Sequence, residues 1–239
     1  MKYIFSTFLL LVCFTSIKAS HVPGGNITYE CIGPNTYVVT LTVFEDCGTA
    51  FIGNMPESIS VTNTCGLTFS TNISLPIVTY QQEISQLCLP MLGQSECNGG
   101  GFPGVYMHIW RDTITLPGPC DSWIFSYDDC CRNASQNLVG TGNDYYFETV
   151  LNSNTASCNS SPIITASPIP YNCLNQPVVY NFGVYEPDGD SLVYSLVSAL
   201  DDPGLPVPYQ GGYSGASPIN GININPNTGE ITFTPTIQG

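Results

Sequence analysis

The chain has 239 residues, of which 43% are hydrophobic and only 9% are charged. Its 4 lysines and arginines stand against 18 aspartates and glutamates, which gives a formal net charge of −14 at pH 7. Binding to phosphates depends on clustered cations, and this composition lacks them. We therefore expect no nucleic-acid partner and no adsorption to anionic lipid. The length is sufficient for one large domain or two ordinary ones.

The first twenty residues have the layout of a secretory signal peptide. Lys2 is followed by an apolar run over residues 4–14, and the small residues Ala19 and Ser20 come after it. This order predicts cleavage after Ala19 or Ser20. A retained membrane anchor is the alternative, but a membrane span needs about 20 apolar residues and this run is shorter. We expect a mature chain that is secreted or held at the cell surface, with no insertion into the membrane.

The number of cysteines fits an oxidising environment outside the cell. Of the 11 cysteines, Cys13 belongs to the signal segment, and the other ten remain in the mature chain. An even number in an exported chain predicts up to about five disulfides, although the sequence does not give their connectivity. We expect Cys130 and Cys131 to bond to different partners, because a bridge between neighbours is strained. Zinc is the alternative, but the chain has no CxxC motif and only two histidines, His21 and His108.

Alternation of apolar and polar residues predicts an all-β fold. Residues 27–32 and 37–44 are expected to form strands joined by a GPNT turn, which is a strong hairpin signal. The same alternation recurs at residues 105–111, 123–127 and 145–151. No window combines a helical period with capping residues, and glycines and prolines interrupt every candidate helix.

A change in composition predicts a domain boundary. Residues 152–161 are small and polar, and a proline-punctuated stretch follows them. We expect a cysteine-rich all-β domain over residues 21–160 and an Ig/cadherin-like β-sandwich over residues 161–239. The second domain offers short strands at residues 178–185, 192–197, 222–225 and 231–236. A complete sandwich needs about seven, so we expect this one to be incomplete, with further domains following Gly239; a small complete domain with an exposed edge is the alternative.

The sequence EPDGDS, residues 186–191, is the motif with the most chemical content. Two carboxylates flank a glycine that can adopt positive φ, and they stand just before a predicted strand. Calcium prefers clustered carboxylate and carbonyl oxygens, so the motif predicts a calcium site; a solvated acidic turn is the alternative. The expected ligands come from this loop and from an acidic pair further along that could return to the same end of the sandwich: Glu186, Asp188, Asp190, Asp201 and Asp202.

Catalytic motifs are missing from the sequence. His21 lies at or near the mature N-terminus and His108 alternates within a strand, so neither histidine suits a Ser–His–Asp triad, and no GxSxG motif occurs. Asp128 and Asp129 precede the adjacent cysteines, which fits a disulfide-pinned turn better than a glycosidase pair. We therefore expect no catalytic residues and a protein that is not an enzyme.

Aromatic residues offer an alternative function. The chain has 14 tyrosines and 2 tryptophans, and residues 106–110 and 145–146 could stack on a sugar, although most aromatic residues of a β protein belong to its core. The sequence thus predicts an adhesive or structural protein with a surface protein or a glycan as its ligand. The alternatives are a glycan-binding module of a secreted protein and, less favoured, an accessory region of an extracellular hydrolase.

Several stretches of the chain resemble one family. CCRN at residues 130–133 and PDGDSLVYSL at residues 187–196 are the most specific of them. With the stretches around them, they are similar to the N-terminal region of very large Bacteroidetes surface proteins, known as gliding-motility-associated or PKD-domain-containing proteins. Residues 177–239 also resemble putative-Ig, cadherin-like repeats, through PDGDSLVYSL and the later NPNTGEITFTP.

This resemblance implies an architecture and a location more than a mechanism. It implies tandem β-sandwiches, calcium at the PDGD loop and an adhesive or structural role outside the outer membrane. It also implies export by the type IX secretion system through a C-terminal sorting domain, which residues 1–239 do not include.

Overall fold

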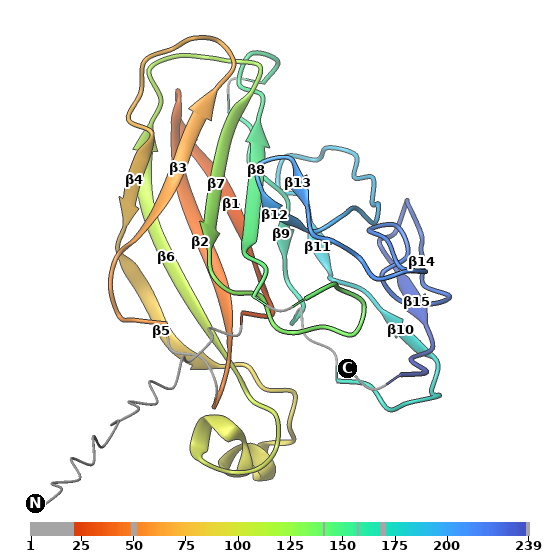
Figure 1. Ribbon diagram of the computed structural model, residues 1–239. Coiled ribbons are helices and arrows are strands. Elements are labelled where there is room, and N and C mark those ends of the chain that lie inside the picture. The colour runs from red at the N-terminus through yellow and green to blue at the C-terminus, as the bar shows by residue number, and fades with distance from the viewer. Residues whose placement is uncertain (1–21, 49–51, 141, 157, 168–170, 238–239) are drawn as a thin grey trace, which may run out of the picture.

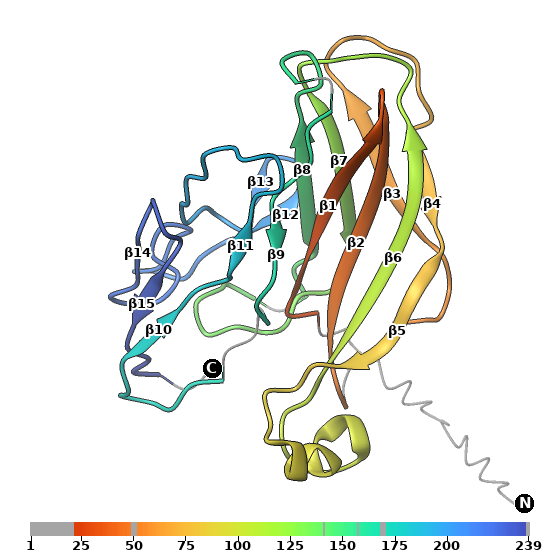
Figure 2. The same ribbon diagram turned by 180° about the vertical axis from the view of Figure 1, so that it is seen from behind.

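The computed structural model describes residues 22–48, 52–140, 142–156, 158–167 and 171–237. The fold is all-β, as the sequence predicts, and its strands form antiparallel sheets (Figures 1 and 2). The predicted signal peptide and His21 lie outside the described residues. Within the described ranges, no helix has the length and apolar character needed to cross a membrane.

One of the two larger sheets has four strands, built around the predicted hairpin. Its strand order is β1 (Gly24–Gly33), β2 (Thr36–Asp46), β6 (Val105–Thr115) and β5 (Ile77–Glu83). The turn between β1 and β2 places Asn35 at a φ of 52°, a left-handed conformation that asparagine tolerates well. The expected strands at residues 27–32, 37–44 and 105–111 are confirmed, each with longer bounds.

The other large sheet has six strands and draws on both halves of the chain. Its order is β13 (Leu205–Pro206), β12 (Leu200–Asp202), β8 (Tyr145–Leu151), β7 (Trp123–Asp129), β3 (Glu57–Asn63) and β4 (Asn72–Leu75). Leu200 of β12 pairs with Tyr146 of β8, so residues beyond the expected domain boundary extend a sheet that begins before it.

Smaller elements complete the fold. A sheet of three strands has the order β10 (Val178–Tyr180), β15 (Ile231–Phe233) and β14 (Asn223–Ile224), and a pair joins β11 (Val184–Tyr185) to β9 (Ile163–Ile164). Two short 3-10 helices, η1 (Leu89–Gln94) and η2 (Glu96–Asn98), occupy the loop between β5 and β6.

The core lies between the two larger sheets. Trp110 of β6 and Trp123 of β7 are fully buried there, together with Leu41 of β2 and Phe125 of β7. Alternation along each strand sends these side chains inward and leaves the intervening residues on the outer faces. Large aromatic rings pack with aliphatic side chains in the space between the layers.

The C-terminal segments depart from the expected strands. The stretch predicted at residues 178–185 divides into β10 and β11, and residues 192–197 form no strand. Residues 192–197 alternate between half-buried and exposed, yet no neighbouring strand forms a ladder with them. Instead, the N–H of Tyr194 donates to the carbonyl of Pro226 at 3.0 Å. Alternation of half-buried and exposed residues indicates that one face of a segment is buried. A β-strand also requires backbone hydrogen bonds to a neighbouring strand.

Three disulfides join segments that are far apart in the sequence. Cys31–Cys158 ties β1 to the segment after β8, Cys47–Cys97 ties the end of β2 to η2, and Cys65–Cys120 ties the end of β3 to the loop before β7. Their Cα–Cα distances of 5.3, 4.9 and 5.9 Å are typical of disulfides. The predicted disulfide-rich character is confirmed.

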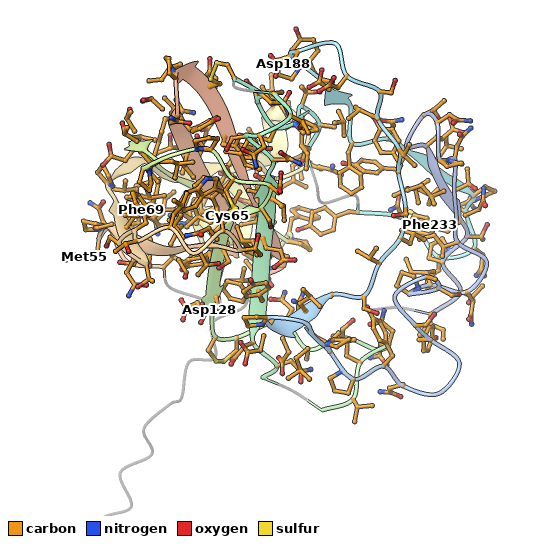
Figure 3. All side chains as sticks on the ribbon, turned by 90° about the horizontal axis from the view of Figure 1, so that it is seen from above. Met55, Cys65, Phe69, Asp128, Asp188 and Phe233 are labelled. Atoms are coloured by element: carbon orange, nitrogen blue, oxygen red, sulfur yellow. A yellow bond between two sulfur atoms is a disulfide. The ribbon has the colours of Figure 1, made fainter. Side chains whose placement is uncertain are left out.

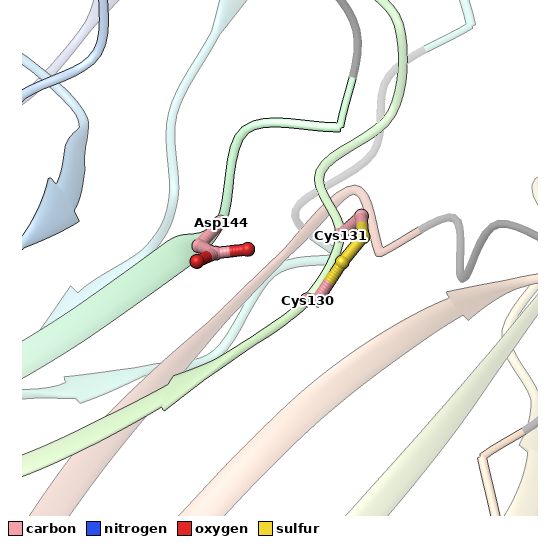
Figure 4. A group of neighbouring side chains, drawn as sticks. All are labelled: Cys130, Cys131 and Asp144. Atoms are coloured by element: carbon pink, nitrogen blue, oxygen red, sulfur yellow. A yellow bond between two sulfur atoms is a disulfide. The ribbon is translucent and has the colours of Figure 1, made fainter.

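The structure bonds Cys130 to Cys131 (Figure 4). The expectation that these neighbours have separate partners is therefore wrong. Both residues follow the end of β7, where the chain leaves the sheet, and their sulfur atoms meet each other there. With Asp144 they form the only group of three or more potential metal-ligating side chains among the described residues. Because a disulfide leaves no thiolate to bind metal, this group does not offer the zinc site that was the alternative.

Candidate functional site

The EPDGDS loop follows β11 and closes on itself. The backbone N–H of Asp190 donates to Glu186 Oε2 at 2.7 Å. Gly189 has a φ of 85°, a conformation that a residue with a side chain would adopt only with strain. The expected positive φ of this glycine is confirmed.

Asp188 joins this loop to the first sheet. Its Oδ2 accepts a hydrogen bond from the N–H of Ser160 at 2.6 Å, and Ser160 Oγ in turn accepts from the N–H of Cys31 in β1 at 3.2 Å. Ser160 is only 7% exposed and Asp188 is exposed, so the contact is partly shielded from water. Figure 3, which is seen from above, shows Asp188 beside the N-terminal strands, on the side of the C-terminal segments.

Ser161 strengthens the same junction. Its N–H donates to the carbonyl of Tyr29 at 2.8 Å, and its Oγ accepts from the N–H of Tyr29 at 2.9 Å. Burial raises the pKa of Tyr29 to about 12, with smaller contributions from Tyr37 and Asp188. Together with the Cys31–Cys158 disulfide, these bonds bind the segment expected to be a linker tightly to β1.

The five expected calcium ligands are divided between two places. Glu186, Asp188 and Asp190 share the loop, whereas Asp201 and Asp202 belong to β12. All five are described, and no three of their carboxylates lie close enough to hold one ion. Two of the loop carboxylates already accept backbone N–H groups. The side chains would have to rearrange to bind calcium, and calcium binding stays a prediction.

Asp201 has a different neighbour, Arg132. Burial lowers the pKa of the Arg132 guanidinium, and the charge of Asp201 opposes this shift, as does Tyr209. Arg132 Nη2 also donates to the carbonyl of Leu200 at 3.1 Å. A half-buried cation needs compensation of this kind, and the hydrogen bond to Leu200 ties β12 to the loop that follows β7.

A groove of about 690 Å³ lies beside Asp188. The outward faces of β1, β2 and β6 form its floor, and residues 163–167 with Pro187 and Asp188 form the opposite wall. Strand register places Thr28 opposite Thr40, and Thr40 opposite Arg111, in one row across the floor. We call this cavity the sheet groove.

The next rows of the sheet groove change from polar to apolar. Asn26 lies opposite Thr42, and beyond them Phe44 lies opposite Met107. The side chains of Asn26, Thr28 and Thr42 make no hydrogen bond to any described residue, so their donors and acceptors are open to a ligand. A polar floor that grades into an apolar end suits a ligand with both kinds of surface.

Arg111 supplies the cation of the sheet groove. Its Nε donates to Thr40 Oγ1 at 3.0 Å, and the side chain is exposed. It forms no ion pair with any carboxylate in the described part of the chain. Arg132, the other arginine, is partly buried. Among the described residues, Arg111 is therefore the exposed cation that can bind an anionic group.

A second cavity, of about 570 Å³, involves aromatic residues from separate segments. Tyr171, Tyr213 and Phe233 line it, with the amides of Asn137 and Asn220 (Figure 3 labels Phe233). Sequence reasoning missed this group because its members share no local pattern. The aromatic residues that the sequence favoured for sugar stacking lie elsewhere: Trp110, Tyr145 and Tyr146 are buried.

His108 faces the core and lines neither cavity. Its Nε2 lies 2.6 Å from Glu45 Oε2, and both side chains are almost completely buried. The rings of Tyr80 and Trp110 pack against it, with ring centroids 5.2 and 5.8 Å away. The Glu45–His108 pair is a polar contact inside the core. The alternation of residues around His108 in the sequence did not indicate that Glu45 is its partner.

No known protein family, curated protein or solved structure matches this chain. The function therefore has to be argued from the junction at Asp188, from the sheet groove and from the cavity at Phe233. The junction at Asp188 and the sheet groove are built from segments held together by the Cys31–Cys158 disulfide and by hydrogen bonds.

Proposed function

We propose that this chain is a non-enzymatic module of a secreted cell-surface protein, with an adhesive or structural role. The observation that carries the proposal is the sheet groove on a disulfide-braced sandwich. Its floor is a β-sheet pinned by Cys31–Cys158 at one edge and by Cys47–Cys97 at the end of β2. A preorganised surface loses little entropy when it binds a ligand.

Disulfides also suit a protein that works outside the cell. The three long-range bridges close chain separations of 127, 50 and 55 residues. Each bridge of this kind typically stabilises a fold by about 2–4 kcal/mol. Such bridges persist in oxidising environments and are rare in the cytosol. The secretory signal predicted at residues 1–20 points to the same location.

The resemblance to Bacteroidetes surface proteins supports the same function. In that setting the chain is the first part of a larger polypeptide exported by the type IX system, with further domains after Gly239. Calcium is the ion implied for the EPDGDS loop, where Asp188 and Asp190 would be its carboxylate ligands.

Glycan binding is the second candidate function, and the floor of the sheet groove favours it. Hydroxyl and amide groups that lack protein partners can bond to sugar hydroxyls. Arg111 can accept one carboxylate from an acidic sugar. Because the whole protein is strongly acidic, we expect neutral glycans or glycans with isolated carboxylates, and no polysulfated ligands.

A glycan array probed with the mature chain tests this function. We expect bound glycans to lose about three- to tenfold in affinity with Thr42→Val, which removes one hydroxyl and keeps the shape. Thr113→Val is the matched control, because Thr113 is exposed on β6 of the same sheet but does not line the groove. Arg111→Gln should weaken carboxylated glycans and spare neutral ones. Equal losses of glycan affinity in Thr42→Val and Thr113→Val would show that the glycans do not bind in the sheet groove.

If the array shows no binding, the adhesive and structural roles separate in a second experiment. Beads coated with the mature chain are mixed with beads coated with the same protein and with whole cells. Adhesion predicts attachment to one of these surfaces, and attachment should weaken in Arg111→Gln. Beads that attach to neither surface would leave the structural role as the favoured one.

A further inference from the structure

Two cysteines of the mature chain are left without a partner in the structure. The four bridges use eight of the ten cysteines, and Cys88 and Cys173 are free and exposed. Cys88 immediately precedes η1, and Cys173 precedes β10. Their separation in sequence is 173 minus 88, or 85 residues.

The segments that carry these cysteines are already in contact. The N–H of Tyr171 donates to Gln86 Oε1 at 3.2 Å, and each cysteine is two residues from one member of this pair. Burial raises the pKa of Tyr171, and the charges of Asp46 and of Glu96 in η2 raise it further. Figures 1 and 2 show both segments at the end of the molecule where η1 and η2 lie.

We propose that Cys88 and Cys173 form a fifth disulfide, which ties the C-terminal strands to the loop between β5 and β6. A bridge requires Cα atoms about 4.4–6.8 Å apart. Neither Cys88 nor Cys173 belongs to a strand or helix, so both segments can adjust without breaking a ladder. The contact between Tyr171 and Gln86 keeps the two thiols in one neighbourhood while they adjust.

This disulfide forms by thiol–disulfide exchange with a disulfide oxidant. The presence of such an oxidant rests on the secreted location proposed above. One thiol loses its proton, and its sulfur attacks the oxidant to form a mixed disulfide and release one thiol of the oxidant. The second cysteine then displaces the remaining oxidant sulfur. Overall, the two cysteines lose two electrons and two protons, and the oxidant is reduced to two thiols.

The test begins with the mature chain incubated with oxidised glutathione and then with N-ethylmaleimide under denaturing conditions. After digestion with glutamyl endopeptidase, mass spectrometry should show residues 84–96 linked through Cys88 to Cys173 in residues 149–186, which the Cys31–Cys158 bridge also joins to residues 31–45. Neither Cys88 nor Cys173 should carry maleimide. Maleimide on both cysteines, or a link between two molecules of the chain, would overturn the proposal.

Stability measurements give an independent check. The melting temperatures of Cys88→Ser, Cys173→Ser and the double variant should all fall by the same amount relative to the oxidised chain, because each removes the same single bridge. Additive losses would show that the two residues act separately. If cell fractionation instead left the protein in the cytosol, the proposed location would fail while the pairing in the purified chain would still be measurable.

Discussion

Asp188 Oδ2 accepts the backbone N–H of Ser160 at 2.6 Å, across 28 positions of sequence. This bond connects an acidic loop near the C-terminal strands to the edge of the first sheet. It also holds the carboxylate of Asp188 beside β1, because Ser160 in turn accepts a hydrogen bond from Cys31. The wall of the sheet groove depends on it, since Pro187 and Asp188 belong to that wall.

Asp188→Ala should destabilise the fold by about 1–3 kcal/mol, because it leaves the N–H of Ser160 without an acceptor in a partly shielded position. Urea denaturation of the mature chain measures this loss. Asp190→Ala is the matched control from the same loop, because only its backbone N–H takes part in the turn. Equal stability of the two variants would show that the Asp188–Ser160 bond contributes nothing.

Calcium binding should raise the melting temperature in millimolar calcium relative to a chelator, since a ligand that binds only the folded state stabilises it by mass action. Asp190→Ala should abolish the shift while leaving the melting temperature in chelator nearly unchanged. Differential scanning calorimetry is the measurement. An unchanged melting temperature in the unmodified chain would remove calcium from the proposed function.

Glu45→Ala should cost about 3–5 kcal/mol, because His108 would keep its buried position without its partner. Replacing both residues, as Glu45→Met with His108→Phe, should cost less than Glu45→Ala alone, because two apolar side chains need no partner in the core. Denaturant midpoints of the three proteins give the comparison. A double variant less stable than Glu45→Ala would contradict this reasoning.

Alkaline pH should destabilise the fold through buried tyrosines. Burial raises the pKa of Tyr29 from 10.0 to about 12, so the folded state retains a proton that the unfolded state loses. The stabilisation is complete below pH 10 and is lost as the pH rises from 10 through about 12. Burial raises the pKa values of Tyr127 and Tyr145 in the same direction.

The urea midpoint should therefore fall as the pH rises from 10.0 to about 12, and the decrease should be smaller in Tyr29→Phe, which has no phenol to titrate. The Tyr29→Phe variant loses the bond from its hydroxyl to the carbonyl of Val150, so only the slope with pH is compared. A midpoint that stays flat over this range would contradict the prediction.

Local sequence was sufficient for the first hairpin. The alternation in residues 27–32 and 37–44, with a turn between them, predicts β1 and β2 because both signals lie within a few residues of each other. The same signal failed at residues 192–197, where alternation reports a half-buried face and no neighbouring strand forms a ladder. Strands β3, β4 and β5 were not predicted, although β3 alternates and is as long as β7.

The candidate site was only partly predictable. The turn at Gly189 follows from the EPDGDS sequence, because positive φ is a local requirement. The neighbours of Asp188 and Asp201 do not follow from it. Ser160 and Arg132 reach them through the folding of distant segments, and nothing in the loop itself encodes those contacts.

The amino-acid sequence by itself determined the all-β class, the β1–β2 hairpin, the abundance of disulfides and the acidic character, since each follows from composition or from neighbours along the chain. Only the tertiary structure decided which cysteines pair, which acids stand apart, and where three strands and the segment after Ser161 enclose a groove. Those properties depend on contacts between segments that are far apart in sequence, and such contacts exist only once the chain has folded.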